Sequence, residues 1–225
     1  MTTSPRIILL HATQVAFDPI HTAFREIWPE PELVNLLDDA LTPDRAREPD
    51  LSEAMTERLV SLGRYALKIG ADAILVTCSA FGPAIDVMAR EFSIPVLKPN
   101  DAMFQAALEI GSNIGMMATF QPSISTMEVE FNEHAASIGK AATLKTILVE
   151  DAMTALRAGD AETHNRLIAS RAGELGAVDA IMLAHFSTSR AQAYVQASSS
   201  AHVLTAPSAA VQRLRTLLEG PQKAS

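Results

Sequence analysis

Two stretches of similar sequence, Asp72-Ala-Ile-Leu-Val76 and Asp179-Ala-Ile-Met-Leu183, lie 107 residues apart (179 − 72 = 107). Polar residues follow each stretch, with Thr77-Cys78-Ser79 after the first and Ala184-His185 after the second. A short apolar run bounded by polar residues is typical of a strand buried on both faces of a parallel sheet. The two stretches therefore predict equivalent central strands in two similar halves of the chain.

Three further pairs of segments obey the same offset of 107 residues. They are residues 6–10 with 113–117, residues 95–97 with 202–204, and Ala102 with Ala209 inside two alanine-rich segments. Because four pairs share one offset, we infer a duplicated architecture.

Each half is predicted to alternate strands with helices. The expected strands are residues 7–10, 34–37, 73–76 and 96–97, then 114–117, 144–149, 180–183 and 203–204; the expected helices are residues 51–69, 83–92, 101–110, 162–175 and 190–198. Ser52 and Asn100 are expected to cap helices, and Gly70 to end one. This alternation predicts an α/β fold of two pseudo-symmetric lobes, each a parallel sheet flanked by helices, Rossmann-like or flavodoxin-like. Lobe one is expected at residues 1–100 plus 206–225, and lobe two at residues 101–205.

The composition of the chain excludes several classes of function. The 225 residues are 48% hydrophobic and carry a formal net charge of −8, which disfavours nucleic acid and anionic membrane as partners. One cysteine cannot form an internal disulfide or a zinc site of two thiolates. Neither G-x-G-x-x-G nor a P-loop lysine motif occurs, which disfavours a nucleotide cofactor. We expect a cytoplasmic protein without metal or cofactor.

Cys78 and His185 are the candidate catalytic residues. They follow the two central strands and occupy equivalent positions, since 185 − 78 = 107. Ligands of open parallel sheets bind beyond the carboxyl ends of the strands. A thiol and an imidazole, with ordinary pKa values of about 8.5 and about 6.5, can exchange protons near neutrality. A helix beginning behind Cys78 is expected to favour its thiolate. We therefore predict an acid–base pair acting across one small ligand.

Polar and aromatic residues beside the same strand ends are the candidate substrate-binding residues. Hydroxyl groups and backbone amides there can donate to a carboxylate, and an aromatic ring can form an apolar wall. The candidates are His11, Thr13, Thr77, Ser79, Thr119, Phe186, Ser187 and Thr188. The remaining helical histidines, His21, His134 and His164, have no paired ligand at metal spacing and are expected at the surface.

The segments around Cys78 and His185 resemble the aspartate/glutamate/hydantoin racemase superfamily, which includes maleate isomerase and arylmalonate decarboxylase. The resemblance covers nearly the whole chain, including Gly115-Met-Met-Ala-Thr119, which is similar to the opening strand of the family's second lobe. It implies cofactor-independent proton transfer at a carbon next to a carboxylate. Cys78 matches the first-lobe cysteine, whereas His185 stands in place of the second, and Ser79 stands where many members have asparagine. A two-thiol racemase is therefore excluded.

Three functions remain open at this point. The first is a racemase or isomerase of a small carboxylic acid with Cys78 and His185 as acid and base. In the second, Cys78 is a covalent nucleophile of a cis-trans isomerase or hydrolase. In the third, the chain binds a small carboxylate without catalysis. The sequence does not identify the substrate, and it leaves open whether the chain forms a homo-oligomer, as many family members do.

Overall fold

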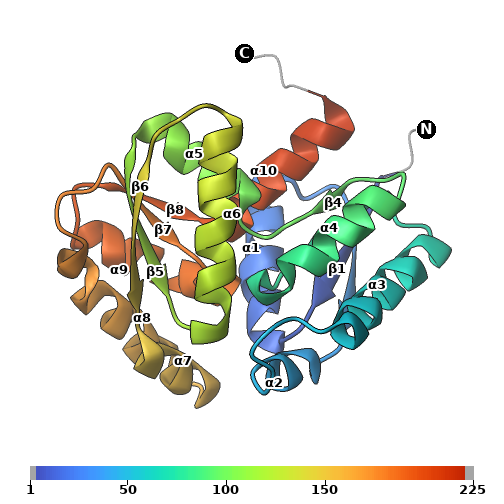
Figure 1. The fold of residues 1–225 in the computed structure, drawn as a ribbon, viewed down its shortest axis with the longest axis horizontal. Coiled ribbons are helices and arrows are strands. Elements are labelled where there is room, and N and C mark those ends of the chain that lie inside the picture. The colour runs from blue at the N-terminus through green and yellow to red at the C-terminus, as the bar shows by residue number, and fades with distance from the viewer. Residues whose placement is uncertain (1–3, 221–225) are drawn as a thin grey trace. The chain divides into compact units, whose positions relative to one another are not determined.

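The computed structural model describes residues 4–220, which form two compact units (Figure 1). The described residues up to Pro99 and from Ala210 onward form unit 1, and Asn100–Ala209 form unit 2. Each unit contains one four-stranded parallel sheet, so the predicted α/β fold with two similar lobes is confirmed.

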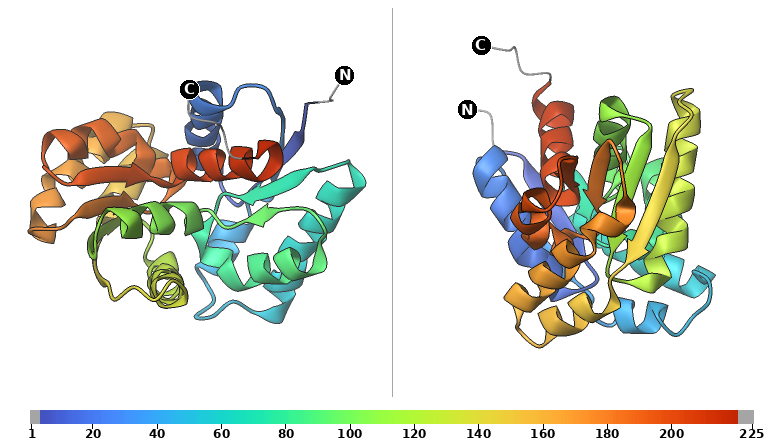
Figure 2. Two further views of the ribbon diagram at one scale, coloured as in Figure 1. Left: turned by 90° about the horizontal axis from the view of Figure 1, so that it is seen from above. Right: turned by 90° about the vertical axis from the view of Figure 1, so that its left-hand side faces the viewer.

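Unit 1 is built on a sheet with the strand order β2-β1-β3-β4. The first α-helix and the last one of the chain lie on one face of this sheet, and α3 and α4 lie on the other (Figures 1 and 2). The elements are β1 (Arg6–His11), η1 (Gln14–Ala16), α1 (Phe17–Ile27), β2 (Glu32–Leu37), α2 (Leu41–Arg45), α3 (Glu53–Lys68), β3 (Ala73–Val76), η2 (Ser79–Phe81), α4 (Gly82–Glu91), β4 (Val96–Leu97) and α10 (Ala206–Glu219), where η marks a 3-10 helix.

Unit 2 repeats this order as β6-β5-β7-β8, with α5 and α6 on one face and α8 and α9 on the other (Figure 2). Its elements are α5 (Asp101–Ile110), β5 (Asn113–Ala118), η3 (Gln121–Ser123), α6 (Ile124–Ser137), β6 (Thr143–Leu148), α7 (Glu150–Arg157), α8 (Ala161–Ser170), η4 (Ala172–Leu175), β7 (Ala180–Leu183), η5 (Phe186–Ala191), α9 (Gln192–Ala197) and β8 (His202–Thr205).

Strand register confirms the repeat and shows where it breaks. Ile7 pairs with Ala73 in unit 1, and Ile114 pairs with Ala180 in unit 2, each partner shifted by 107 residues. At the β1–β2 pair the partner of Arg6 is Glu32, whereas its equivalent in unit 2 is Thr143, at an offset of 143 − 32 = 111. The connection between β5 and β6 is therefore four residues longer than the one between β1 and β2.

A carboxylate fixes the start of the first strand of each sheet. Asp72 accepts a hydrogen bond from the backbone N–H of Arg6 at 2.7 Å, and Asp179 accepts one from Asn113 at 2.8 Å. Both partners obey the 107-residue offset. Gly111 allows the second contact, because a Cβ atom there would lie 2.2 Å from the Asp179 carboxylate.

Central strands β3 and β7 are buried along their whole length, as their apolar sequences predict. Ser52 caps α3 by accepting a hydrogen bond from the Met55 backbone N–H at 3.3 Å, and Gly70 follows this helix at φ +82°. The predicted cap at Asn100 is wrong. Its fully buried side chain makes no capping bond, and neither amide atom has a hydrogen-bond partner.

Candidate functional site

Cys78 follows β3 directly and is partly exposed, between the buried residues Thr77 and Ser79. Burial of its sulfur raises the pKa of the thiol to about 11, against the opposing effects of the Ala80 backbone N–H and the Arg45 charge. The expected thiolate is therefore wrong for the protein without ligand. The donors at the start of η2 are present, but loss of solvent outweighs them.

His11 closes the carboxyl end of β1, next to β3, and is fully buried. Its Nδ1 lies 2.8 Å from the Thr77 hydroxyl and its Nε2 lies 2.9 Å from Oδ1 of Asn35. An amide oxygen only accepts hydrogen bonds, so Nε2 carries the hydrogen and Nδ1 accepts from Thr77. Burial lowers the pKa of His11 to about 4. His11 and Thr77 thus hold each other across two strands as a neutral pair.

The sequence analysis did not include Asn35 among the site residues. It interrupts the apolar run of β2, and its Oδ1 also accepts from Nε2 of His21 at 3.0 Å. A carboxamide inside a strand of otherwise apolar residues is the signal that marks it. Asn35 ties β2 to His11 and fixes the orientation of that imidazole.

His185 occupies the position after β7 that Cys78 occupies after β3. It is also partly exposed, while Ala184 and Phe186 beside it are buried. Its Nδ1 accepts a hydrogen bond from the Thr119 backbone N–H at 3.2 Å and lies 3.2 Å from the Thr119 hydroxyl. Its Nε2 lies 2.8 Å from the hydroxyl of Ser123, which itself donates to the Phe120 carbonyl.

These partners fix the tautomer of His185. A backbone N–H can only donate, so Nδ1 provides the lone pair and Nε2 carries the hydrogen, which it donates to Ser123. Burial lowers the pKa of His185 to about 4. The ring is therefore neutral at pH 7, with its basic nitrogen held by the backbone.

The candidate substrate-binding hydroxyls fall into two groups. Thr77 and Thr119 contact histidines, and Thr188 donates to the His185 carbonyl at 2.6 Å. By contrast, within residues 4–220 the hydroxyls of Thr13, Ser79 and Ser187 form no hydrogen bond, so they keep their capacity to bind a ligand. Phe186 is only 2% exposed and packs in the interior of unit 2.

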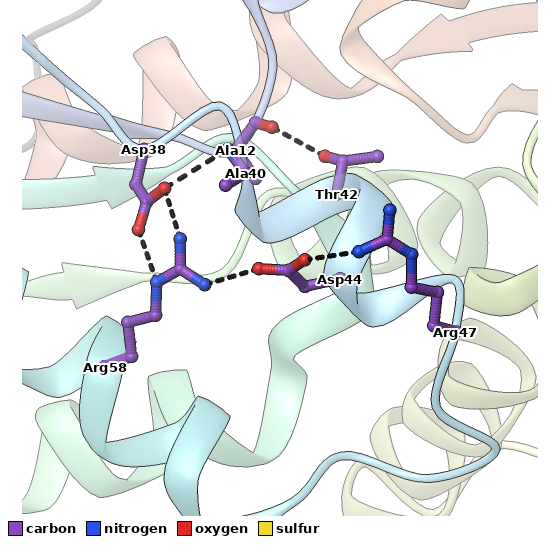
Figure 3. A network of polar contacts seen from close by, with 7 residues as sticks. All are labelled: Ala12, Asp38, Ala40, Thr42, Asp44, Arg47 and Arg58. Carbon is purple, nitrogen blue, oxygen red and sulfur yellow. Dashed lines mark hydrogen bonds and ion pairs between the residues drawn. The ribbon is translucent and has the colours of Figure 1, made fainter.

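Helix α2 is fastened over the carboxyl end of the unit 1 sheet by ion pairs (Figure 3). Arg58 of α3 donates to both carboxylate oxygens of Asp38 at 2.6 Å and to Asp44 of α2 at 2.7 Å. The hydroxyl of Thr42 donates to the Ala12 carbonyl, just after β1, at 2.6 Å. These contacts hold α2 against the loops that follow β1 and β2.

At its end, α2 carries a buried arginine that the sequence analysis missed. Arg45 is 5% exposed, and its Nε donates to the Ala80 carbonyl at 3.4 Å. Its Nη1 donates to the Glu48 carbonyl at 2.7 Å. The sequence gives little warning of this position, because Arg45 lies in a charged segment with Asp44, Arg47 and Glu48 that is typical of a solvated surface.

The expectation that His164 lies at the surface is wrong, because the residue is fully buried in α8. Its Nδ1 bonds Oδ1 of Asn165 at 2.8 Å. His21 and His134, by contrast, are partly exposed. Within the described part of the chain, no three His, Cys, Asp or Glu side chains gather as ligands of a metal ion would. None of the helices in residues 4–220 has the length and apolar character needed to cross a membrane.

Comparisons with solved structures show a shared fold. Glutamate racemase from Bacillus anthracis superposes with a TM-score of 0.80 at 13% identity, covering 96% of this chain and 82% of that one. Aspartate racemase from Picrophilus torridus gives 0.70 at 15% identity, covering 98% and 96% of the two chains. Allantoin racemase from Klebsiella pneumoniae gives 0.69 at 17% identity, covering 96% and 88%.

Sequence comparison identifies the family more directly. No protein of curated function matches the chain by sequence. The family model described as Asp/Glu/Hydantoin racemase, however, matches residues 7–214, which include both sheets and both candidate catalytic positions. The chain belongs to the Asp/Glu/hydantoin racemase family.

Proposed function

We propose that the protein is a cofactor-independent racemase or isomerase that acts at the carbon next to the carboxylate of a small acid, with Cys78 and His185 as acid and base. Family membership is the observation that carries a racemase-type function. The roles of the two residues rest on their equivalent places after β3 and β7 and on their protonation states. The proposal requires both loops to contact the same ligand.

The resting protonation states of the two groups are complementary. With a pKa of about 11, the Cys78 thiol keeps its proton at pH 7. With a pKa of about 4, His185 keeps a lone pair at Nδ1. A proton donor and a proton acceptor are thus present together, and inversion at a carbon needs one of each on opposite sides.

Proton transfer to His185 requires a rearrangement. The carbon–hydrogen bond of the substrate breaks as Nδ1 takes the proton, and the Thr119 backbone N–H must first leave this nitrogen. The released N–H can then donate to the substrate carboxylate, whose negative charge grows in the enediolate-like intermediate. Cys78 gives its proton to the opposite side of the carbon and becomes a thiolate. Proton exchange with water returns both groups to their resting states.

The free hydroxyls provide further support for carboxylate binding. Thr13 and Ser79 in unit 1 and Ser187 in unit 2 have no hydrogen-bond partner among the described residues. Each can donate to a carboxylate oxygen without breaking an existing bond. Donors already aimed at the developing charge contribute more to the rate than groups that must reorganise.

Incubation of candidate acids in D₂O tests the proposal. Chiral amino acids, hydroxy acids and hydantoins are followed by NMR for deuterium at the carbon next to the carboxyl group. We expect uptake to fall about 10²–10⁴-fold in Cys78→Ala and in His185→Gln. His202→Gln, at an exposed position on β8, is the control. Uptake that persists in Cys78→Ala contradicts the proposal. Ligand binding without turnover in both proteins identifies a binding protein instead.

One observation favours a second candidate, a cis-trans isomerase in which Cys78 alone performs the chemistry. Both ring nitrogens of His185 already have partners within unit 2. In this reaction the Cys78 thiolate adds to one alkene carbon, forming a carbon–sulfur bond and a single carbon–carbon bond. After rotation about that bond, the thiolate leaves and the double bond re-forms. Mass spectrometry of an unsaturated diacid trapped on Cys78, with His185→Gln still active, would support this candidate.

A further inference from the structure

Arg45 is a buried cation for which no carboxylate partner is found within residues 4–220. Both of its hydrogen bonds go to backbone carbonyls, those of Ala80 and Glu48. Burying a charge without an opposite charge is costly. The other arginines of the same region, Arg47 and Arg58, pair with aspartates. Arg45 therefore differs from its neighbours in lacking an anion.

The Ala80 residue connects Arg45 to Cys78. Its carbonyl accepts from Nε of Arg45 at 3.4 Å, while its backbone N–H donates to the Cys78 sulfur. Arg45 thus reaches Cys78 in two ways, through the residue that hydrogen-bonds the sulfur and through its own positive charge. All of these groups belong to unit 1.

We propose that Arg45 is a positioning residue for Cys78: its guanidinium holds the η2 loop through Ala80, and its charge stabilises the thiolate that forms during turnover. The need for a thiolate rests on the proposed function, in which Cys78 gives up a proton. The Cys78 thiolate is then the anion that Arg45 lacks in the resting protein.

Other charged and titratable groups near the loop do not take this role. His11 contacts Thr77, the residue before Cys78, and is neutral at pH 7 because burial lowers its pKa to about 4. Glu48 meets Arg45 through its backbone carbonyl, and its carboxylate oxygen Oε2 is buried without a partner. Arg58 is bound to Asp38 and Asp44. Arg45 is the one charge that acts on the Cys78 sulfur among the described residues.

Alkylation of Cys78 by iodoacetamide tests the inference without a substrate. The chain has one cysteine, so intact-mass measurements follow this thiol alone. Arg45→Gln keeps donors for the Ala80 carbonyl but removes the charge. We expect its alkylation rate between pH 7 and pH 10 to fall about tenfold, which corresponds to a rise of about one unit in the thiol pKa. Arg45→Lys keeps the charge and is expected to stay within about threefold of the parent protein.

Arg47→Gln is the matched control, because Arg47 is an exposed neighbour paired with Asp44 and is expected to leave the rate unchanged. Circular dichroism establishes that each variant is folded. An unchanged or faster rate in Arg45→Gln overturns the inference, and so does a tenfold loss in Arg45→Lys, which also serves if the Gln variant fails to fold. A raised KM in Arg45→Gln with normal alkylation also overturns it, while leaving the proposed function intact. If alkylation falls as expected and no acid is turned over, the proposed function fails and the inference stands.

Discussion

The backbone N–H of Thr119 donates a hydrogen bond to Nδ1 of His185 at 3.2 Å and joins the end of β5 to the loop after β7. This contact determines both the tautomer and the charge of the imidazole. It also connects the chemistry to stability, because any protonation of His185 must break it.

Lowering the pH is expected to destabilise the fold between about pH 6.5 and about pH 4. The pKa values of His11 and His185 are lowered from 6.5 to about 4, so in this range the unfolded chain binds protons that the folded chain does not. The free energy of unfolding therefore falls as the pH falls and levels off below pH 4 for these groups, by about 3 kcal/mol each. Urea unfolding at pH 7 and pH 4.5 measures the loss.

The matching control uses substitutions of single histidines. His185→Gln is expected to reduce the difference between the two pH values, whereas His202→Gln, at an exposed position, leaves it unchanged. A pH dependence of the same size in His185→Gln and in the parent protein contradicts the assignment of a neutral His185.

Removing the hydroxyl of Ser123 should destabilise unit 2. Ser123 is fully buried and accepts the hydrogen of His185 Nε2, so Ser123→Ala leaves that donor without a partner. The expected cost is about 1–3 kcal/mol. Ser137→Ala at the other end of α6 removes an exposed hydroxyl and is expected to cost far less. Equal midpoints of denaturant unfolding for the two variants count against the His185–Ser123 contact.

Gly111→Ala should interfere with the carboxylate that fixes β5. The new Cβ atom would lie 2.2 Å from the Asp179 side chain, which must then move away from the N–H groups of Ser112 and Asn113. We expect a lower melting temperature than in Gly173→Ala, since a Cβ atom at Gly173 meets nothing within 4 Å. Hydrogen exchange of the Asn113 amide provides a local measurement. Unchanged protection there would show that Asp179 does not hold this strand.

The assignment of residues 206–225 to lobe one stays a prediction that α10 can test. Arg215 donates to the Ile27 carbonyl at 2.9 Å, and the indole N–H of Trp28 donates to Glu219 at 2.8 Å. Leu214 of α10 is fully buried, whereas Leu217 is 43% exposed.

Leu214→Ala is therefore expected to cost about 2–5 kcal/mol, and Leu217→Ala within about 0.5 kcal/mol. Trp28 is the one tryptophan of the chain and is fully buried beside α10, so its fluorescence in urea reports unfolding of unit 1. If both variants unfold at the parent's urea concentration, α10 does not stabilise this unit.

Strands could be predicted closely because burial on both faces leaves a direct trace in the sequence. The bounds 73–76, 96–97 and 180–183 agree with β3, β4 and β7. Helix ends were less certain. The predicted helix 162–175 is α8 to Ser170 followed by η4, since a 3-10 turn continues an apolar pattern without continuing the α-helix.

Site geometry was predictable only where it depends on strand ends. Cys78 and His185 could be placed after their strands from the repeat, although their catalytic roles stay predictions. Partners from distant segments, such as Asn35 for His11 and Ser123 for His185, depend on tertiary packing that local sequence does not encode. The raised pKa of Cys78 follows from the same packing, because desolvation is a property of the folded surroundings.

The duplicated aspartates have a consequence for how this molecule can change. Asp72 and Asp179 anchor the amino-terminal ends of both sheets in the same way, while the opposite ends carry a thiol in one half and an imidazole in the other. Mechanical support and chemical identity are thus located at opposite borders of each sheet. A laboratory that wishes to redesign the reactive groups can vary one border freely and leave the inherited scaffold untouched.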